Sequence, residues 1–208
     1  MSRYVFIGDS ITDCGRVRDD PSSLGDGYVS LLAAELGARP EPGEVVNLGI
    51  SGDRAVDLER RWGAELIPSA PEVLTVFVGV NDMWRRFDAD DPTSADAFER
   101  SYRAILADAV SASNPRLILM EPFFVPVRAE QRSWLDDLGP KREVVARLGS
   151  EFDADVVPLH DLMTRAAAAA APGEIAPDGV HPTAAGHRLI ADAWITALDS
   201  RLSSTLAL

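Results

Sequence analysis

The sequence predicts an α/β protein, a three-layer α/β/α sandwich around a five-stranded parallel sheet. Short, continuous apolar runs alternate with longer segments in which apolar residues recur at helical spacing. Continuous apolar runs are typical of strands that are covered on both faces, as in a parallel sheet. Alternation of strands and helices along the whole chain implies right-handed crossovers, which place helices on both faces of the sheet. No glycine-, serine- or proline-rich linker and no internal repeat divides the chain, so we expect residues 1–208 to form a single domain.

Four continuous apolar runs predict buried strands. They lie at Tyr4–Ile7, Val45–Leu48, Val73–Val78 and Leu117–Met120, and the shorter run Val156–Val157 predicts a fifth strand. The segments between these runs have the period of a helix. Apolar residues recur there at i, i+3, i+4 and i+7, in the segments 29–36, 98–110, 144–152 and 189–198. The alanine run 166–171 predicts a further helical segment, whereas the acidic stretch 88–94 predicts a solvated loop.

Composition and charge exclude several classes of protein. The chain contains 20 basic and 33 acidic residues, which gives a formal net charge of −13 at pH 7. Nucleic-acid phosphates and anionic membranes repel such a surface, so we expect neither as a partner. Cys14 is the only cysteine and there are three histidines. An intrachain disulfide and a Cys/His zinc cluster are therefore excluded.

The sequence predicts neither a secretion signal nor a membrane span. The first apolar run is too short for the core of a signal peptide, and no window approaches ~18 consecutive apolar residues. No glycine-rich nucleotide-binding motif follows a predicted strand. We therefore expect a soluble, cytoplasmic protein without cofactor or metal. The sequence leaves its oligomeric state open, a homo-oligomer included.

Polar, glycine-bearing turns follow three of the predicted strands. They are Gly8–Thr12, Asn47–Asp53 and Gly79–Asp82. Because ligands of open α/β sheets bind outside the carboxyl ends of the strands, we expect these turns to open onto one site. A fourth block carries Asp178 three residues before His181. A carboxylate in that place can receive the imidazole Nδ1–H and leave Nε2 to accept a proton from a serine hydroxyl.

Together the four blocks resemble the signature of the SGNH hydrolases, the serine-esterase superfamily also called GDSL lipases. The resemblance covers essentially the whole chain and implies the flavodoxin-like sandwich of that superfamily. It implies that Ser10 is the nucleophile, His181 the general base and Asp178 the partner of the imidazole.

The same resemblance implies an oxyanion hole. Its donors would be the backbone N–H groups of Ser10 and Gly52 and the side-chain amide of Asn81. Each such donor stabilises the transition state by roughly 3–4 kcal/mol. Gly49 lies in the same block as Gly52 and leaves some choice of the second donor.

Two longer strings, residues 9–16 and 81–86, are similar to the intracellular bacterial acetylxylan-esterase branch of the superfamily. This likeness implies an enzyme that removes short acyl groups, chiefly acetyl, from carbohydrate such as xylo-oligosaccharides through an acyl-enzyme on Ser10. Trp84 and Arg85 are then candidates for substrate binding. Trp84 can form a wall that stacks on a sugar ring, or it can be a packed aromatic of a surface helix.

Other functions remain open at this point. Within the hydrolases, the alternatives are a general short-chain esterase, a lipase or a thioesterase, although no long apolar insertion that could form a lipase lid is present. From a different class, a non-catalytic binding module could use the same scaffold, since a fold does not determine a function. Such a module would have no reason to combine Ser10, Asp178 and His181.

Several of these residues also have purely structural interpretations. The Gly8-Asp9-Ser10 block also fits a turn before a helix, Asn81 also fits an Asx turn, and Gly52 also fits a backbone position with positive φ. We expect Asp9 to hydrogen-bond within its own turn. We expect structural roles for five further residues: His160, His187, Trp62, Trp134 and Trp194. Cys14 is interpreted as a buried or loop thiol, because it has no histidine nearby in the sequence.

Overall fold

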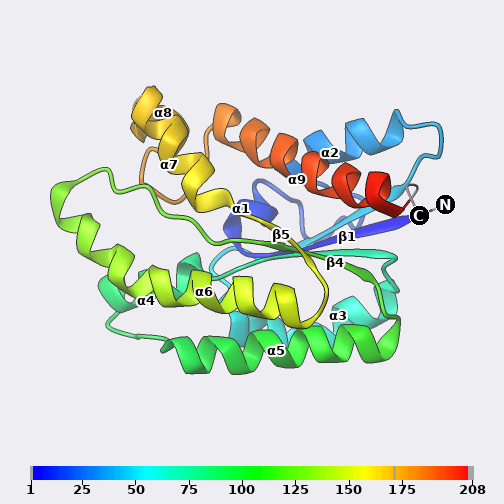
Figure 1. Ribbon diagram of the computed structural model, residues 1–208, viewed down its shortest axis with the longest axis horizontal. Coiled ribbons are helices and arrows are strands. Elements are labelled where there is room, and N and C mark those ends of the chain that lie inside the picture. Colours follow the sequence, from blue (N-terminus) through cyan, green and yellow to red (C-terminus); the bar gives the residue numbers. More distant parts are fainter. Residues whose placement is uncertain (1, 171, 206–208) are drawn as a thin grey trace.

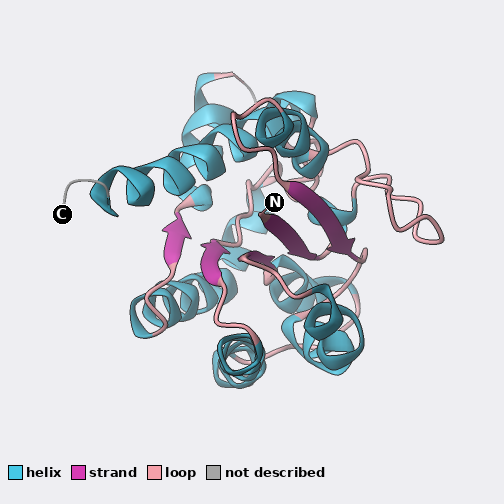
Figure 2. Cartoon of the chain, turned by 90° about the vertical axis from the view of Figure 1, so that its right-hand side faces the viewer, coloured by secondary structure: helices cyan, strands magenta, loops and turns pink. Residues whose placement is uncertain are grey.

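All five predicted strands are present, and they form one parallel sheet. The computed structural model describes residues 2–170 and 172–205. Its strands are β1 (Arg3–Gly8), β2 (Glu44–Gly49), β3 (Val73–Phe77), β4 (Arg116–Met120) and β5 (Asp155–Val157). They pair in the order β2-β1-β3-β4-β5, and helices enclose them on both sides (Figure 2). The expected α/β class with a five-stranded parallel sheet is confirmed.

The helices of the described chain fall into two layers (Figure 1). One layer contains α2 (Tyr28–Gly37), α7 (Leu159–Ala169) and α9 (Ala184–Thr205), with the short α1 (Ser10–Asp13) and α8 (Pro172–Ile175). The other contains α3 (Ala55–Ser69), α5 (Ala95–Ala112) and α6 (Leu135–Glu151), with α4 (Val80–Asp88) at its end. A 3₁₀ segment, η1 (Ala129–Trp134), leads into α6.

Each face of the sheet has its own apolar core. Successive residues of a strand point to opposite faces, and in β1 the ring of Phe6 packs toward α2 and α9 while Val5 and Ile7 pack toward α3 and α5. The predicted packing tryptophans follow the same division. Trp194 lies in the first core and Trp62 in the second, both almost completely buried.

The structure differs from the sequence prediction mainly in its helices. Helix α3 was not predicted, because its apolar residues are few among charged ones, although four of them lie on one face and are buried: Ala55, Leu58, Trp62 and Leu66. Helix α6 begins nine residues before the predicted segment, since the weak helix formers Gly139 and Pro140 obscure its first turns. In the alanine run, α7 ends at Ala169, and Ala171 lies outside the described residues.

The strand order determines where a site can form. From β1 the chain moves outward to β2 and then returns to the other side of β1, to form β3. The crevice beside the carboxyl ends of β1 and β3 is therefore a topological switch point, where open α/β sheets bind ligands. Helix α1 starts directly after β1, and α4 starts three residues after β3. None of the helices that the described residues form is long and apolar enough to cross a membrane.

Candidate active site

Ser10 is presented by the turn between β1 and α1. Asp9 is the N-cap of α1, and its carboxylate accepts a hydrogen bond of 3.0 Å from the backbone N–H of Ile11. Side-chain oxygens in this position satisfy backbone donors that the helix itself leaves unpaired. The expectation that Asp9 hydrogen-bonds within its own turn is therefore confirmed. Its neighbour Ser10 is the first residue of the helix and is partly exposed at the carboxyl end of the sheet.

His181 connects Ser10 to Asp178. The hydroxyl oxygen of Ser10 lies 2.9 Å from Nε2 of His181, and Nδ1 of the same ring lies 2.6 Å from Oδ2 of Asp178. An ionised carboxylate only accepts hydrogen bonds, so the ring hydrogen of neutral His181 belongs on Nδ1. Nε2 is then free to accept the hydroxyl hydrogen of Ser10. The structure thus brings together three residues from the two ends of the chain, as the sequence predicts.

The turn that carries His181 is organised by Asp178. Oδ1 of Asp178 accepts hydrogen bonds from the backbone N–H groups of Val180 and His181, at 2.9 and 2.8 Å, while Oδ2 accepts from the imidazole. The turn is attached to the loop after β4, where the N–H of Val125 donates to the carbonyl of Gly179. Partial burial would raise the pKa of Asp178, but the bonds from the side chain and backbone of His181 hold this pKa below its ordinary value. Asp178 is therefore ionised at neutral pH.

The predicted second oxyanion donor lies in the turn after β2. Gly52 has a φ of +90°, which is strained for any other residue, and a methyl group at its Cα would contact nothing within 4 Å. Gly49 differs, because its N–H donates to Oδ1 of Asn47 and its Cα packs against the backbone of α1. Gly52 thus faces open space, while the N–H of Gly49 is already used within the turn.

Asn81 approaches the same region from the first turn of α4. The helix is preceded by Gly79, whose φ of +130° turns the chain from β3 into the helix. Asn81 is only 2% exposed, and its amide nitrogen donates a 3.1 Å hydrogen bond to the carbonyl of Asp53. A side-chain amide has two N–H donors. The bond to Asp53 therefore orients the amide and leaves its second hydrogen for a ligand.

Comparison with known proteins shows the family to which the chain belongs. Residues 6–189 match the model of the GDSL-like lipase/acylhydrolase family. The protein belongs to that family. The chain is 34% identical to an acetylxylan esterase of Geobacillus stearothermophilus, over 93% of this chain and 92% of the esterase.

Solved structures of GDSL family members agree with this assignment. A crystal structure of an acetylxylan esterase from Geobacillus stearothermophilus superposes with a TM-score of 0.87 at 30% identity, over 94% of this chain and 93% of that one. A GDSL-like lipase of Parabacteroides merdae gives a TM-score of 0.90 at 31% identity, over 94% of both chains. The resemblance to SGNH hydrolases, and within them to the acetylxylan-esterase branch, is confirmed. The protein is a carboxylic-ester hydrolase of this family.

Asp13 and Arg18, which the sequence did not indicate as site residues, support the turn of Gly52. Oδ2 of the buried Asp13 accepts from both the N–H and the hydroxyl of Ser51, at 2.8 and 2.7 Å, and pairs with Arg18. The bonds from Arg18 and Ser51 outweigh burial and hold the pKa of Asp13 below its ordinary value. These contacts tie the end of α1 to the residue before Gly52. Asp13 and Ser51 are 38 positions apart, so no local sequence pattern predicts the contacts between them.

Arg61 of α3 gives a second such connection within the GDSL site. Its guanidinium pairs with the carboxylate of Asp53 at 2.8 Å, with Glu65 at 2.7 Å, and reaches the carbonyl of Gly8 at 3.3 Å. The carbonyl of Asp53 in turn accepts from the amide of Asn81. Arg61 therefore links the end of β1, the turn after β2 and the start of α4 in one polar network.

Two buried carboxyl groups flank the nucleophile and Asn81. Asp9 and Asp82 are each 1% exposed, and each has one oxygen, Oδ2 and Oδ1 respectively, that finds no hydrogen-bond partner in the described part of the chain. The other oxygen of Asp82 accepts from the N–H of Ala55 at the start of α3. Burial raises the pKa of both groups to about 7. Both carboxyls are therefore protonated at mildly acidic pH.

Of the two predicted substrate-binding residues, Trp84 lies next to His181, and Arg85 lies against the indole of Trp84. The indole of Trp84 and the imidazole of His181 have ring centroids 5.8 Å apart, with planes inclined by 56°. Cζ of Arg85 lies 5.9 Å from the centroid of the Trp84 ring, and its guanidinium forms an ion pair with Asp88. Trp84 is only partly buried and also packs against the core.

The other two histidines have buried structural positions. His160 accepts a long hydrogen bond of 3.4 Å from the N–H of Phe124, and burial lowers its pKa to about 4. His187 has Nδ1 3.1 Å from the N–H of Tyr28 and Nε2 3.2 Å from Sγ of Cys14. In the folded protein Cys14 therefore does have a histidine neighbour, His187, although none lies near it in the sequence.

This Cys14–His187 pair does not form a second nucleophile–base pair. Burial lowers the pKa of His187 to about 4, so its ring is neutral. Since Nδ1 accepts from the backbone of Tyr28, the ring hydrogen lies on Nε2 and is donated to the sulfur of Cys14. A nitrogen that already carries its hydrogen cannot take a proton from the thiol.

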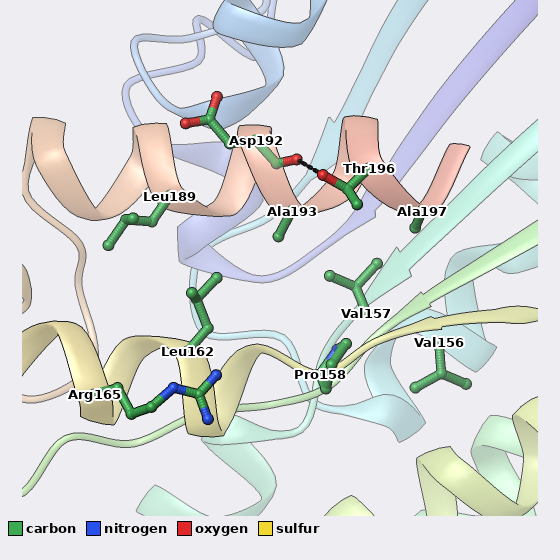
Figure 3. Close-up of a pocket in the computed structure, with 10 residues that line it drawn as sticks. All are labelled: Val156, Val157, Pro158, Leu162, Arg165, Leu189, Asp192, Ala193, Thr196 and Ala197. Carbon is green, nitrogen blue, oxygen red and sulfur yellow. Dashed lines mark hydrogen bonds between the residues drawn. The ribbon is translucent and has the colours of Figure 1, made fainter. Parts of the chain in front are cut away.

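His181 and Asp178 are open to solvent and lie outside two grooves of the described chain. The side chains of His181 and Asp178 are 46% and 44% exposed. A groove of about 480 Å³ lies between α7, α9 and β5, lined by apolar residues such as Leu162 and Leu189 (Figure 3). A second, of about 580 Å³, lies between η1 and α7. Neither is lined by a residue of the Ser10–His181–Asp178 set.

Proposed function

We propose that this GDSL hydrolase removes acetyl groups from acetylated xylo-oligosaccharides, with Ser10, His181 and Asp178 as its catalytic triad. The observation that carries the proposal is the continuous relay from the Ser10 hydroxyl through His181 to Asp178, at 2.9 and 2.6 Å. Both distances are those of a nucleophile that is ready to lose its proton to a base, and of a base held in one tautomer.

The first half of the reaction forms an acyl-enzyme. The hydroxyl oxygen of Ser10 attacks the ester carbonyl, and its proton passes to Nε2 of His181. The ionised Asp178 stabilises the imidazolium that results. Negative charge develops on the former carbonyl oxygen, where the N–H groups of Ser10 and Gly52 and the amide of Asn81 would donate hydrogen bonds. Collapse of this intermediate breaks the ester bond, and His181 returns the proton to the departing sugar hydroxyl.

The second half releases acetate. A water molecule takes the place of the sugar and attacks the acetyl group on Ser10, while Nε2 of His181 accepts one of its protons. The same donors hold the second tetrahedral intermediate. When it collapses, the bond between the acetyl carbon and the oxygen of Ser10 breaks, and His181 returns the proton to that oxygen. Acetate leaves, and the starting state is restored.

Two observations support acetylated carbohydrate as the substrate. Relatives that match more than nine-tenths of this chain include enzymes that are named acetylxylan esterase and acetyl-xylooligosaccharide esterase. In addition, a triad that is nearly half exposed can receive an ester whose alcohol part is a bulky, hydrated sugar. A long fatty acyl chain would instead require an apolar channel at Ser10, and the two grooves described above lie elsewhere.

Further support for the triad comes from the same relative. Among its solved structures are two catalytic mutants, one with a serine and one with an aspartate replaced by alanine. Trp84 and Arg85 are proposed to line the approach of the sugar, since Trp84 lies beside His181 and Arg85 lies against Trp84. Arg85 is already paired with Asp88, so the indole is the larger contact available to a sugar ring.

The remaining parts of the proposal concern partners and location. We expect a small-molecule or oligosaccharide ester as the binding partner and no nucleic acid, which a net charge of −13 disfavours. A cytoplasmic location is proposed as well, and it is supported by the single cysteine, which allows no intrachain disulfide.

The decisive experiment compares Ser10→Ala with a matched serine variant. Ser113→Ala is suitable, because Ser113 is exposed after the last residue of α5, far from the carboxyl ends of the strands. Acetate release from acetylated xylo-oligosaccharides and labelling by a fluorophosphonate probe are measured for both. We expect Ser10→Ala to lose at least about 10⁴-fold in kcat and all labelling, and Ser113→Ala to retain both. Full activity of Ser10→Ala would exclude the proposed mechanism.

A second measurement separates the alternatives within the hydrolases. p-Nitrophenyl esters from acetyl to palmitoyl are compared at equal concentration. We expect kcat/KM to be highest for acetyl and to fall steadily with chain length. A maximum at long chains would indicate a lipase, and a preference for acyl thioesters over oxygen esters would indicate a thioesterase.

A further inference from the structure

The contact between Trp84 and His181 joins two parts of the site that are otherwise separate. Trp84 belongs to α4, three residues after Asn81, whereas His181 belongs to the turn before α9. Their ring centroids are 5.8 Å apart and their planes are inclined by 56°. Sugar binding alone would not require the indole to touch the imidazole.

His181 changes charge during the reaction. It is neutral when Ser10 is protonated, and it becomes a cation when it takes the proton of Ser10. A cation within about 6 Å of an indole centroid is attracted by the electron-rich face of the ring, and tryptophan is the strongest partner of this kind. We propose that Trp84 is a positioning residue that stabilises the protonated imidazole of His181 in the transition state. The inference rests on the proposed function, because it requires His181 to be the base.

The other charged groups around His181 leave this role open to Trp84. From its own turn the ring faces the carboxylate of Asp178, and from α1 it faces the hydroxyl of Ser10. On α4 the guanidinium of Arg85 lies against the indole, but its charge is balanced by Asp88. On α9, His187 is buried and uncharged at neutral pH.

The imidazolium therefore has a carboxylate on Nδ1 and the indole at its side. Asp178 is already ionised before the reaction, and its bond to Nδ1 is formed in the ground state. The attraction to Trp84, like the attraction to the carboxylate of Asp178, becomes strong when His181 acquires its charge. Interactions that strengthen only in the transition state raise kcat.

The indole of Trp84 also has an effect that opposes this stabilisation of protonated His181. A bulky indole also shields the imidazole from water, and loss of water disfavours the charged form of histidine. If shielding dominated, removal of Trp84 would help the ring to hold its proton, and the ascending limb of the pH–rate profile would move to higher pH. If attraction dominates, the same change moves that limb to lower pH.

The test uses a substrate without sugar, so that stacking on a sugar ring cannot contribute. Values of kcat/KM for p-nitrophenyl acetate are measured from pH 5 to pH 9 for the wild type, Trp84→Leu and Trp84→Phe. The control is Phe87→Leu, which removes an exposed aromatic ring one turn further along α4 that stacks on Trp134 instead.

We expect the midpoint of the ascending limb to move to lower pH by roughly 0.5 to 1 unit in Trp84→Leu and by less in Trp84→Phe. The plateau at high pH should fall about two- to fivefold in Trp84→Leu. Phe87→Leu should leave the midpoint unchanged. The graded effect of the phenylalanine variant distinguishes attraction by an aromatic face from simple loss of packing, and it stays measurable if the leucine variant folds poorly.

Two outcomes would overturn the inference. They are an unchanged midpoint and a shift of the midpoint to higher pH in Trp84→Leu. These outcomes of the pH–rate test would not contradict the proposed function, which depends on the loss of activity in Ser10→Ala. Conversely, an active Ser10→Ala variant would remove the proposed mechanism, and with it the basis for this inference.

Discussion

The two sides of the active site are held by different means. The side that would bind the oxyanion lies in a buried polar network, in which Asp13 fixes Ser51 and Arg61 joins Asp53 to the end of β1. The side that carries the base is a surface turn, with the side chains of Asp178 and His181 about half exposed. That turn is held mainly by its own hydrogen bonds.

This difference shows how one site combines a fixed electrostatic environment with an accessible base. Donors that stabilise a developing charge are effective when they are oriented in advance, and burial in a network provides that orientation. In the proposed reaction the base meets a bulky sugar ester and then a water molecule, and exposure allows both. We therefore expect changes on the buried side to affect stability and rate together, and changes on the exposed side to affect the rate alone.

The largest effect should come from the exposed side. In Asp178→Asn the side-chain oxygen still accepts from the backbone N–H groups of Val180 and His181, so the NH2 group faces Nδ1. Because NH2 only donates, the ring changes to the tautomer that cannot accept from Ser10. We expect kcat for an acetyl ester to fall by roughly 10³-fold or more. Because the turn is at the surface, Tm should change by no more than about 2 °C. Calorimetry and steady-state kinetics on the same preparation check both, and a large drop in Tm would contradict the proposed separation.

A smaller loss of activity, together with a loss of stability, is expected from a change on the buried side. Asp13→Ala leaves the N–H and hydroxyl of Ser51 without their acceptor and Arg18 without its partner. We expect a loss of about 2–3 kcal/mol in the free energy of unfolding. A roughly tenfold lower kcat should accompany it, since the turn of Gly52 is no longer tied to α1. Urea unfolding and steady-state kinetics measure the two quantities.

The chain contains a close control for this variant. Asp20 accepts from the N–H and the hydroxyl of Ser22, just as Asp13 accepts from those of Ser51, but Asp20 is exposed and bonds only within its own turn. Asp20→Ala should leave both the unfolding curve and kcat close to those of the wild type. Equal losses in the two variants would mean that burial of the network does not matter.

The smallest effect concerns the pH dependence of stability. Burial raises the pKa of Asp82 to about 7 in the folded protein, whereas an aspartate in an unfolded chain has a pKa near 3.9. Between about pH 4 and pH 7 the unfolded chain has lost this proton while the folded chain keeps it. The contribution of Asp82 is thus fully favourable below pH 4 and is lost as the pH rises toward 7.

Asp82→Asn removes that loss, because an amide has no proton to release in this range. Relative to the wild type, we expect the variant to gain about 1.4 kcal/mol in unfolding free energy between pH 5 and pH 6. Urea unfolding at the two pH values measures the change. An identical pH dependence of wild type and variant would show that Asp82 is ionised in the folded protein.

The parts of the protein that could be predicted from the sequence are those encoded locally. The strands were recognisable because each contains a short apolar run, and the three central strands, β1, β3 and β4, are largely buried on both faces. The pair Asp178 and His181 was recognisable because its hydrogen bond spans only three residues. Ser10, Gly52 and Asn81 could be placed together because each directly follows, or lies close after, a strand of one parallel sheet.

What the sequence could not show are contacts between distant residues whose types are common. Asp13 and Arg61 look like ordinary surface residues of a helix end and a charged helix, and only the folded chain brings them to Ser51 and Asp53. The closeness of Cys14 and His187, which are 173 positions apart, is of the same kind. Helix α3 was missed because the charged residues that make its polar network also hide its apolar face.

The exposure of the Asp178–His181 turn has a consequence for the lifetime of the acyl-enzyme. With nearly half of the His181 side chain open to solvent, bulk water can reach the base as soon as the sugar has left. The second half of the reaction then needs no conformational opening to admit its nucleophile. In the proposed reaction, an intermediate in such contact with solvent meets water far more often than sugar hydroxyls, so we expect hydrolysis to acetate rather than transfer of the acetyl group.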